Sequence, residues 1–374
     1  MSSSRCREPR DLRLDGIRGI AVLLVLLYHT TTPNRILGTD YPLLPGGWVG
    51  VDVFFVLSGY LITRLLLVEL QAEGRIDARA FFIRRVRRLM PALVVLLVVW
   101  LLVTQTGLLT VQQLGSTYTD RGLGLAFVPV VGAFTLLYNW LLAFELPTPM
   151  GMGHLWTLSV EEQFYVAWVT VFLVVAAKCA RPRLVLWWLV VAGSVGSLVL
   201  TALEAGGSRD FAYFSSPTSG LGLLVGAAIA LSPPLRGGNL CAVTGLSTIV
   251  LCALFVPDTA PDLLVLAVLA TCVGTAMLIC GGGWLDRVLT LSWLRYAGRR
   301  SYAMYLWSSP LAYATAVWGG RTWAMDVVLL GSTLILAELS WRLVERRFLA
   351  PRPLRHATPP PQPPIASEPI LVQT

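Results

Sequence analysis

Long apolar stretches separated by short polar loops repeat along almost the whole chain. Each is close to the roughly 20 residues that a helix needs to cross about 30 Å of hydrocarbon. The pattern predicts an all-α polytopic membrane protein, since in lipid only helices and closed barrels satisfy every backbone polar group. There are eleven such segments, at 15–33, 48–68, 90–106, 121–143, 155–178, 184–203, 218–233, 240–256, 262–280, 301–318 and 326–344.

The positively charged residues decide how many segments cross, because they concentrate in cytoplasmic loops. The segment 121–143 contains Pro129 and several glycines, and we expect it to be re-entrant or to lie at the surface. About ten transmembrane helices then remain, in a multi-pass protein of the cell membrane whose N and C termini are both cytoplasmic. Of the 29 lysines and arginines, 24 then lie on the cytoplasmic side, four on the other side and one, Arg18, in the membrane. If all eleven segments crossed, Arg346 and Arg347 would lie outside.

Two stretches lie outside the predicted spans. Residues 70–89 contain an amphipathic, arginine-rich sequence, RIDARAFFIRRVRR, which we expect to lie on the inner leaflet. The chain from Pro351 is polar and rich in proline, which predicts a disordered cytoplasmic tail over 350–374. The membrane domain therefore covers 1–349, and any chemistry must take place among its helices.

Composition and missing motifs narrow the function classes. With 55% hydrophobic and 13% charged residues and a mean hydropathy of +0.69, the chain cannot coat a water-soluble core. The net charge of +8 lies in clusters between apolar runs, which indicates membrane lipids as partners and argues against nucleic acid. The six cysteines lack CxxC spacing, and no P-loop, GxSxG or HExxH motif is present. We therefore expect no metal site and no bound cofactor.

Ionisable groups inside a span are costly and serve as functional candidates. Arg18 and His29 are eleven residues apart, so they share one helix face at a separation of about 16 Å. They could hold two parts of one long substrate, with Arg18 gripping an anion near the cytoplasmic end. Alternatively, Arg18 snorkels to the inner headgroups and His29 lies at the outer interface. Because His356 is in the tail, His29 and His154 are the only imidazoles available for acid or base chemistry near neutral pH.

A second cluster is HLWTLSVEEQFY, residues 154–165. A helix that enters lipid with Glu161 and Glu162 side by side cannot turn both toward acyl tails, so at least one must meet a polar cavity or an arginine. Trp156 and Tyr165, within the same three turns, are candidates for contacting or supporting an acceptor, as is His154. The alternative is a structural ion pair with another helix.

Two further stretches carry polar groups. Asp52 is an acid close to the outer mouth, and the nearby small pair Ser58 and Gly59 is more typical of close helix packing than of chemistry. The arginine cluster that contains Arg85 and Arg88 precedes the span that starts at Pro91. Guanidinium groups suit phosphates, but a topology-setting cluster would need no ligand.

In these stretches the chain resembles membrane acyltransferase family 3, the multi-span O-acyltransferases. The resemblance covers nearly all of residues 11–349 and rests on five motifs in the same order: LDGIRGIAVLLVLLYH, GVDVFFVLSGYLIT, RRVRRLMPA, HLWTLSVEEQFY and GRRSYAMYLWSSP. It implies transfer of an acyl group from acyl-coenzyme A, a co-substrate supplied on the cytoplasmic side, to an acceptor hydroxyl. The positions that match functional motifs are the catalytic histidine and its paired arginine (His29, Arg18), the donor arginines (Arg85, Arg88) and the acidic motif (Glu161, Glu162).

The chain departs from the family pattern at two positions. Thr157 stands where serine is common and keeps the hydroxyl. Ser308 stands where the family usually has a histidine, so the role of that later imidazole is not carried over. In its compact form the chain is similar to the branch that acylates macrolides and other antibiotic intermediates.

The resemblance leads to a mechanistic hypothesis. Arg85 and Arg88, with Arg18 as a third candidate, hold the donor phosphates while the pantetheine arm reaches between the helices to His29. His29 accepts the hydroxyl proton, with Asp52, Glu161 or Glu162 orienting the imidazole. An acyl-histidine intermediate remains open.

Acceptor and function class also stay open at this stage. The acceptor is a hydroxyl-bearing small molecule such as a macrolide, or a sugar or cell-envelope polysaccharide. A proton-coupled transporter or a non-catalytic sensor are the alternative functions.

Overall fold

The computed structural model describes residues 11–30, 44–106, 122–204, 207–258, 260–319 and 322–349, and the backbone of 112–113 and 116–117. The predicted tail over 350–374 lies outside the described residues, so its disorder remains a prediction.

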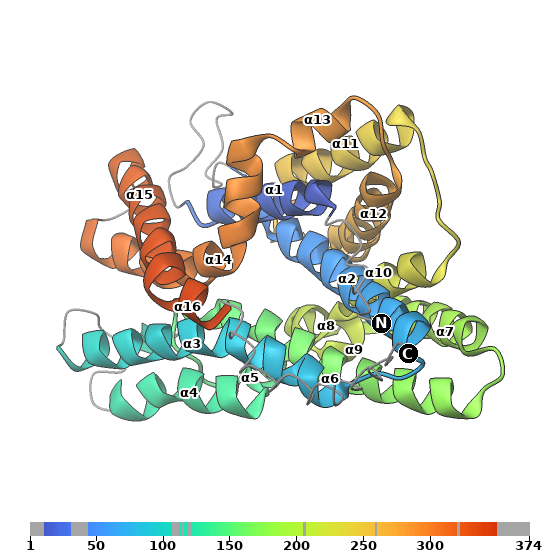
Figure 1. Cartoon of the computed structure of the whole chain (residues 1–374). Coiled ribbons are helices and arrows are strands. Elements are labelled where there is room, and N and C mark those ends of the chain that lie inside the picture. Colours follow the sequence, from blue (N-terminus) through green and yellow to red (C-terminus); the bar gives the residue numbers. More distant parts are fainter. Residues whose placement is uncertain are drawn as a thin grey trace, which may run out of the picture.

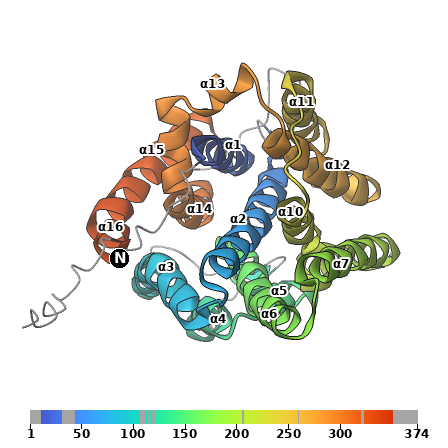
Figure 2. The same ribbon diagram turned by 45° about the vertical axis from the view of Figure 1, so that its right-hand side comes forward.

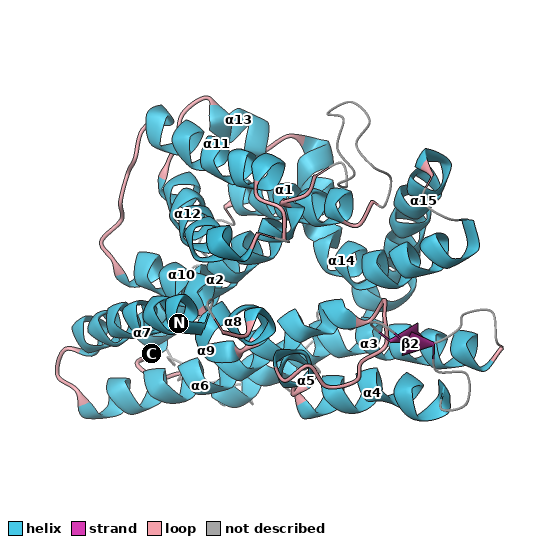
Figure 3. Ribbon diagram, turned by 180° about the vertical axis from the view of Figure 1, so that it is seen from behind, coloured by secondary structure: helices cyan, strands magenta, loops and turns pink. Residues whose placement is uncertain are grey.

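Helices make up almost all of the described chain, which confirms the all-α class (Figures 1 and 3). The strands in the described part are two-residue pieces that pair antiparallel, β1 (Gln112–Gln113) and β2 (Ser116–Thr117). The helices and helical turns are α1 (Leu12–Tyr28), η1 (Gly47–Val49), α2 (Gly50–Glu73), α3 (Ala78–Gln105), α4 (Gly122–Thr135), α5 (Tyr138–Ala143), η2 (Gly153–Leu155), α6 (Trp156–Lys178), α7 (Pro182–Glu204), α8 (Arg209–Phe214), α9 (Ser216–Ser219), α10 (Leu221–Leu231), α11 (Asn239–Phe255), α12 (Pro261–Cys280), α13 (Leu285–Leu289), α14 (Ser292–Gly319), α15 (Trp323–Ser340), the π-helical turn η3 (Trp341–Glu345) and α16 (Arg346–Leu349).

Many of these helices are suited to lipid. Six helical segments are long and apolar enough to cross a membrane: Gly47–Glu73, Ala78–Gln105, Gly153–Lys178, Pro182–Glu204, Leu263–Cys280 and Trp323–Phe348. Shorter apolar helices cover Gly124–Thr135, Ser216–Leu231 and Asn239–Phe255. Large apolar side chains such as those of Leu203, Leu240 and Ile335 are exposed on the outside of the bundle, as lipid contact requires. A polytopic membrane protein is confirmed, and the count of ten crossings remains a prediction.

The segment 121–143 does not form one long helix. α4 is about 21 Å long, shorter than the hydrocarbon core, and the chain turns at Leu136, whose φ is +59°. The Leu136 carbonyl accepts a hydrogen bond from Gln163, about 10 Å into α6. At the other end of α4, the Ala126 carbonyl accepts a hydrogen bond from Trp100, near the end of α3. The chain therefore turns within the bundle between α4 and α5, and its re-entrant placement in the membrane remains a prediction.

Residues 78–89 do not form a separate element but the first part of the helix that continues into the predicted span, and their position on the inner leaflet remains a prediction. α2 ends at Glu73 and the chain turns at Gly74, whose φ is +67°. Asp77 then caps α3, which continues through the arginines and Pro91 as one helix. A continuous helix keeps its backbone hydrogen bonds as it enters lipid, whereas a break there would leave them unsatisfied.

α1 lies in the interior of the bundle beside α2 and α14, while α3, α7, α12 and α15 lie toward the outside (Figure 2). Glycines allow the closest crossings. A Cβ on Gly298 of α14 would lie 1.7 Å from the Asp15 carbonyl oxygen of α1, and one on Gly59 of α2 would lie 1.9 Å from the Leu223 carbonyl oxygen of α10. The packing role predicted for Gly59 is therefore confirmed.

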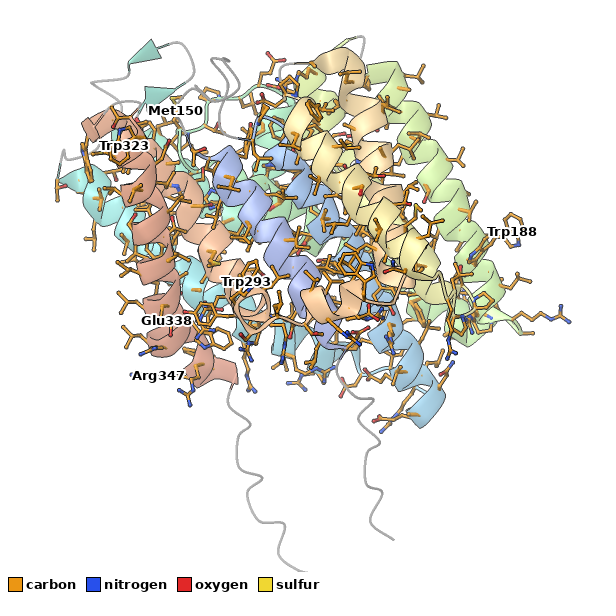
Figure 4. All side chains as sticks on the ribbon, turned by 90° about the horizontal axis from the view of Figure 1, so that it is seen from above. Met150, Trp188, Trp293, Trp323, Glu338 and Arg347 are labelled. Carbon is orange, nitrogen blue, oxygen red and sulfur yellow. The ribbon has the colours of Figure 1, made fainter. Side chains whose placement is uncertain are left out.

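The two ends of the bundle differ in composition. Trp293, Glu338 and Arg347 lie at one end, and Met150 and Trp323 lie at the opposite end (Figure 4). We refer to these as the arginine-rich end and the Met150 end. The start of α1 belongs to the arginine-rich end, because Arg13 forms an ion pair with Asp286 at 3.2 Å, just before α14 begins. α1 therefore runs from the arginine-rich end toward the Met150 end.

Candidate active site

Arg85 on α3 joins the two adjacent carboxylates of α6. Its Nε donates to Glu162 Oε1 at 2.7 Å, and its Nη2 lies 3.4 Å from Glu161 Oε2. All three side chains are largely buried, with 21% of Arg85, 16% of Glu161 and 15% of Glu162 exposed. Successive residues of a helix point about 100° apart, and the planar guanidinium fork is wide enough to serve both. Arg85 therefore compensates the acid pair inside the bundle.

Glu161 has two further partners. Ser58 of α2 donates to Glu161 Oε1 at 2.9 Å, and the Tyr165 hydroxyl donates to Glu161 Oε2 at 3.2 Å. The Arg85 guanidinium lies over the Tyr165 ring, 3.5 Å from its centroid. The packing role predicted for Ser58 is thus replaced by a hydrogen bond. Removing any one of these groups would leave a buried charge or hydroxyl without compensation.

Arg18 and Arg88 lie next to this cluster. Arg18 is close enough to interact electrostatically with Glu161 and Arg85, and Arg88 is close enough to Arg18 and Arg85 to be repelled by both. Arg18 Nε is buried and has no hydrogen-bond partner among the described residues. Arg88 is exposed, and none of the ion pairs of the described chain involves it. The cluster therefore has guanidinium groups that Glu161 and Glu162 do not occupy.

Glu345 belongs to the same neighbourhood and was not predicted from the sequence. It is only 3% exposed, lies in the π-helical turn η3 and accepts a hydrogen bond from Ser340 at 3.3 Å. Arg88 of α3 and Arg300 of α14 are cations close enough to compensate its charge. In the sequence Glu345 stands beside Arg346 and Arg347 at the end of an apolar segment, a pattern typical of a membrane interface. Only the packing of η3 against α3 shows that this carboxylate is buried.

His29 lies at the other end of α1, where it caps the helix. Its Nδ1 is buried without a hydrogen-bond partner in the described chain. The ring of Tyr28 lies 5.7 Å from the His29 ring, and the Tyr28 hydroxyl donates to Asp258 Oδ2 at 2.8 Å. No hydrogen bond joins His29 to Asp52, Glu161 or Glu162 in this structure.

Asp52 lies apart from the arginine cluster. It is 5% exposed, and its Oδ2 has no hydrogen-bond partner in the described parts of the chain. Three groups are close enough to interact electrostatically with the Asp52 carboxylate: Tyr213 of α8, Cys252 of α11 and Cys272 of α12. The structure therefore places Asp52 on the side of α8, α11 and α12, and does not bring it together with Glu161 and Glu162.

His154 is near His29. It is 6% exposed, neither ring nitrogen has a hydrogen-bond partner among the described residues, and the His29 ring is close enough to affect it electrostatically. Trp156, two residues later, packs edge-on against Phe55, with 5.8 Å between ring centroids, and lies tilted against Tyr213 at 5.1 Å. His154 thus has buried polar atoms without a partner among the described residues, whereas the Trp156 ring packs against aromatic rings.

The two positions that depart from the family pattern both contact Tyr305 of α14. Thr157 Oγ1 is 2.9 Å from the Tyr305 hydroxyl and donates to the His154 carbonyl at 3.1 Å. Ser308 is fully buried and donates to the Tyr305 carbonyl at 2.9 Å. Both hydroxyls therefore form local hydrogen bonds between or within α6 and α14.

The described residues offer no obvious metal site. No three histidine, cysteine, aspartate or glutamate side chains converge there as metal ligands. The cysteines that the structure describes are free thiols: Cys179, Cys241, Cys252, Cys272 and Cys280.

Ionisable side chains of α1, α3 and α6 gather inside the helical bundle. The fold and this cluster together define an integral membrane protein with a polar site among its helices. Comparison with known families gives the class. The acyltransferase domain of membrane acyltransferase family 3 matches residues 11–342, and the chain belongs to this family. It is therefore a membrane acyltransferase, which confirms the family resemblance seen in its motifs.

The relatives that match this chain are named as O-acetyltransferases. The chain is 33% identical over 361 residues to "Putative peptidoglycan O-acetyltransferase YrhL" of Bacillus subtilis, and 30% identical over 363 residues to peptidoglycan O-acetyltransferase OatA of Listeria monocytogenes. Each alignment covers 89% of this chain and 54% of the relative. The chain thus spans about half the length of these relatives. No solved structure matches the chain.

Proposed function

We propose that this protein transfers an acyl group from acyl-coenzyme A to a hydroxyl of a cell-envelope glycan, with peptidoglycan as the leading acceptor. The family supports acyl transfer, and the names of the relatives favour an acetyl group and a glycan over a macrolide. One structural observation carries the proposal. A single interior helix, α1, bears Arg18 in a cluster of cations and His29 about 16 Å further along.

The charge distribution supports a direction for the donor. In this proposal the arginine-rich end faces the cytoplasm, as the positive-inside rule favours, and acyl-coenzyme A enters there. Arg88 is exposed and outside the ion pairs of the described residues, so it is the better placed of the two predicted donor arginines to bind a phosphate. Arg85 is already engaged by Glu161 and Glu162 and acts in our proposal by holding the acid pair and Tyr165 in place.

The chemistry then needs one base. The acceptor oxygen attacks the thioester carbonyl carbon while His29 accepts the hydroxyl proton. The carbon–sulfur bond breaks, and the leaving thiolate takes that proton from His29, which returns to its starting state. In the alternative route the acyl group first forms a bond to a His29 nitrogen and is then passed to the hydroxyl. Single-turnover trapping with labelled acyl donor distinguishes the two routes.

The test is release of free coenzyme A. Membranes containing the full chain are mixed with acetyl-coenzyme A and N-acetylglucosamine oligosaccharides or muropeptides, and the thiol is measured together with the mass of the glycan. We expect thiol release and acetylated glycan with the wild-type protein. The substitution His29→Ala is expected to reduce both to a few per cent or less while the protein remains folded and inserted.

Three results would contradict the proposal. Retention of substantial transfer by His29→Ala would exclude His29 as the base. If thiol were released only with a macrolide, the acceptor would be a small molecule and not a glycan. Absence of thiol release with every hydroxyl acceptor would favour the proton-coupled transporter or the sensor.

A further inference from the structure

Three buried ring nitrogens without hydrogen-bond partners belong to two histidines, one at the end of α1 and one just before α6. They are His29 Nδ1 and both Nδ1 and Nε2 of His154, which have no hydrogen-bond partner among the described residues. The backbone of Gly151 and Leu306 approaches the His154 ring, but without hydrogen bonds of normal geometry. Buried polar atoms are nearly always paired, because each unpaired one costs about 1–3 kcal/mol. Three such atoms on two histidines that are close enough to interact electrostatically indicate a site that a polar ligand completes.

The fold holds the backbone of His154 firmly even though its ring lacks partners. The Tyr305 hydroxyl and Thr157 Oγ1 both donate to the His154 carbonyl, at 3.0 and 3.1 Å. Gly151, with φ of +84°, packs so closely on α14 that a Cβ there would lie 2.8 Å from Cβ of Tyr313. The Tyr305 ring also lies edge-on to the His154 ring, 5.5 Å between centroids. The position of the imidazole is therefore fixed by α14 before any ligand arrives.

We propose that His154 binds the acceptor glycan, through a hydrogen bond to a hydroxyl next to the one that reacts at His29. This inference rests on the proposed function. A neutral imidazole presents one N–H donor and one nitrogen acceptor, and a hydroxyl can use either. His154 is one of the two imidazoles at the end of α1 that is remote from Arg18, whereas the donor phosphates are assigned to the cations around Arg18 and Arg88.

Two substitutions at this position separate hydrogen bonding from packing. The substitution His154→Phe keeps a flat ring against Tyr305 and removes both nitrogens. The substitution His154→Gln loses the ring but restores a donor and an acceptor. If His154 acts by hydrogen bonding, phenylalanine is the damaging substitution and glutamine is partly tolerated. A packing role gives the opposite order.

The experiment measures steady-state coenzyme A release by the full chain in membranes, with an N-acetylglucosamine tetrasaccharide as the acceptor probe. For His154→Phe we expect the KM for the tetrasaccharide to rise about tenfold, the loss of one neutral hydrogen bond. The KM for acetyl-coenzyme A and the kcat at saturating acceptor are expected to change less than twofold. His154→Gln is expected to recover at least part of the acceptor affinity.

The outcomes distinguish this inference from the proposed function. If the wild-type protein releases no coenzyme A with any glycan, the proposed function itself is wrong. If the wild-type protein is active and His154→Phe leaves the acceptor KM unchanged, or raises the KM for acetyl-coenzyme A instead, His154 does not bind the acceptor. Greater damage from glutamine than from phenylalanine would assign His154 a packing role.

Discussion

Arg85 and Arg88 are one helical turn apart on α3, yet their partners differ. Arg85 is bound by two carboxylates and covered by the Tyr165 ring. Arg88 has Arg18 and Arg85 as repelling neighbours and buried Glu345 as a carboxylate close enough to compensate it in part. Like charges held close together favour binding of an anion that separates them. At the residue scale, Arg88 and not Arg85 is therefore the expected contact for a donor phosphate.

The substitution Arg88→Gln is expected to raise the KM for acetyl-coenzyme A by about tenfold or more, since a hydrogen bond between charged groups is worth about 1.5–3 kcal/mol. The kcat should change little. Arg87→Gln is the matched control, because Arg87 precedes Arg88 on the same helix and is also exposed. Coenzyme A release at varied donor concentration measures both. If both substitutions changed the KM for acetyl-coenzyme A equally, Arg88 would have no specific role in donor binding, and the arginines would serve only to set the membrane topology.

The motif spacing correctly predicted which helices carry the ionisable side chains of the cluster. It did not predict all the contacts between those side chains. Adjacent carboxylates in an apolar helix required a partner, and the structure supplies Arg85. Nothing in the spacing showed that Ser58 and Tyr165 also bind Glu161, since these contacts depend on how α2 and α6 are rotated. The separation of Asp52 from the acid pair has the same origin.

At the scale of elements, glycine determines how closely α1 and α14 can pack. Asp15 and Gly298 meet so closely that only a hydrogen atom fits between the glycine Cα and the opposing carbonyl. This contact lies close in sequence to Arg18, so a shift of α14 would also displace the cation cluster. Small residues at helix crossings are the general means of close packing in membranes.

The substitution Gly298→Ala is expected to force α1 and α14 apart and to lower the stability of the folded protein by about 1–3 kcal/mol, the usual cost of overpacking. Gly331→Ala on α15 is the control, because a Cβ at Gly331 meets nothing within 4 Å. Thermal unfolding in detergent, followed by size-exclusion chromatography, compares the two. If Gly298→Ala unfolds at the same temperature as Gly331→Ala, the crossing is looser than the structure indicates.

The predicted re-entrant segment, which contains α4 and α5, shows why element boundaries depend on tertiary contacts. Pro129 and the glycines predicted an irregular segment, but not where it turns. The turn at Leu136 is held by Gln163, whose side chain also donates to Asn139 at 3.0 Å, and Asn139 donates to Ser216 at 3.0 Å. A polar network joining α5, α6 and α9 thus satisfies backbone that lipid would leave unpaired.

At the scale of the whole molecule, the two ends of the bundle assign its sides. Arg347 lies at the arginine-rich end and Met150 at the opposite end (Figure 4). In the orientation that we propose from the positive-inside rule, Arg347 faces the cytoplasm and Met150 the opposite side. This orientation determines which substrate reaches which end of α1.

Labelling of single cysteines tests the orientation. In a chain whose native cysteines are replaced by alanine, Met150→Cys should react with a membrane-impermeant maleimide in intact cells. Arg347→Cys should react only after the membrane is permeabilised. The opposite labelling pattern would mean that the protein has the reverse orientation in the membrane. The donor would then have to enter at the Met150 end. Labelling of both residues from outside would contradict the odd number of crossings predicted between Met150 and Arg347.

The sequence by itself determined the solvent, the helical class, the family and the stretches that carry chemistry, because hydrophobic runs, charge clusters and motif spacing are local properties of the chain. Only the tertiary structure decided which of those side chains share a site. It joined Arg85 to the acid pair, buried Glu345 beside Arg88, placed His154 near His29 and kept Asp52 apart. The physical reason is that the rotation and depth of each helix are set by close packing between helices, such as the contacts at Gly59 and Gly298, which no single segment specifies.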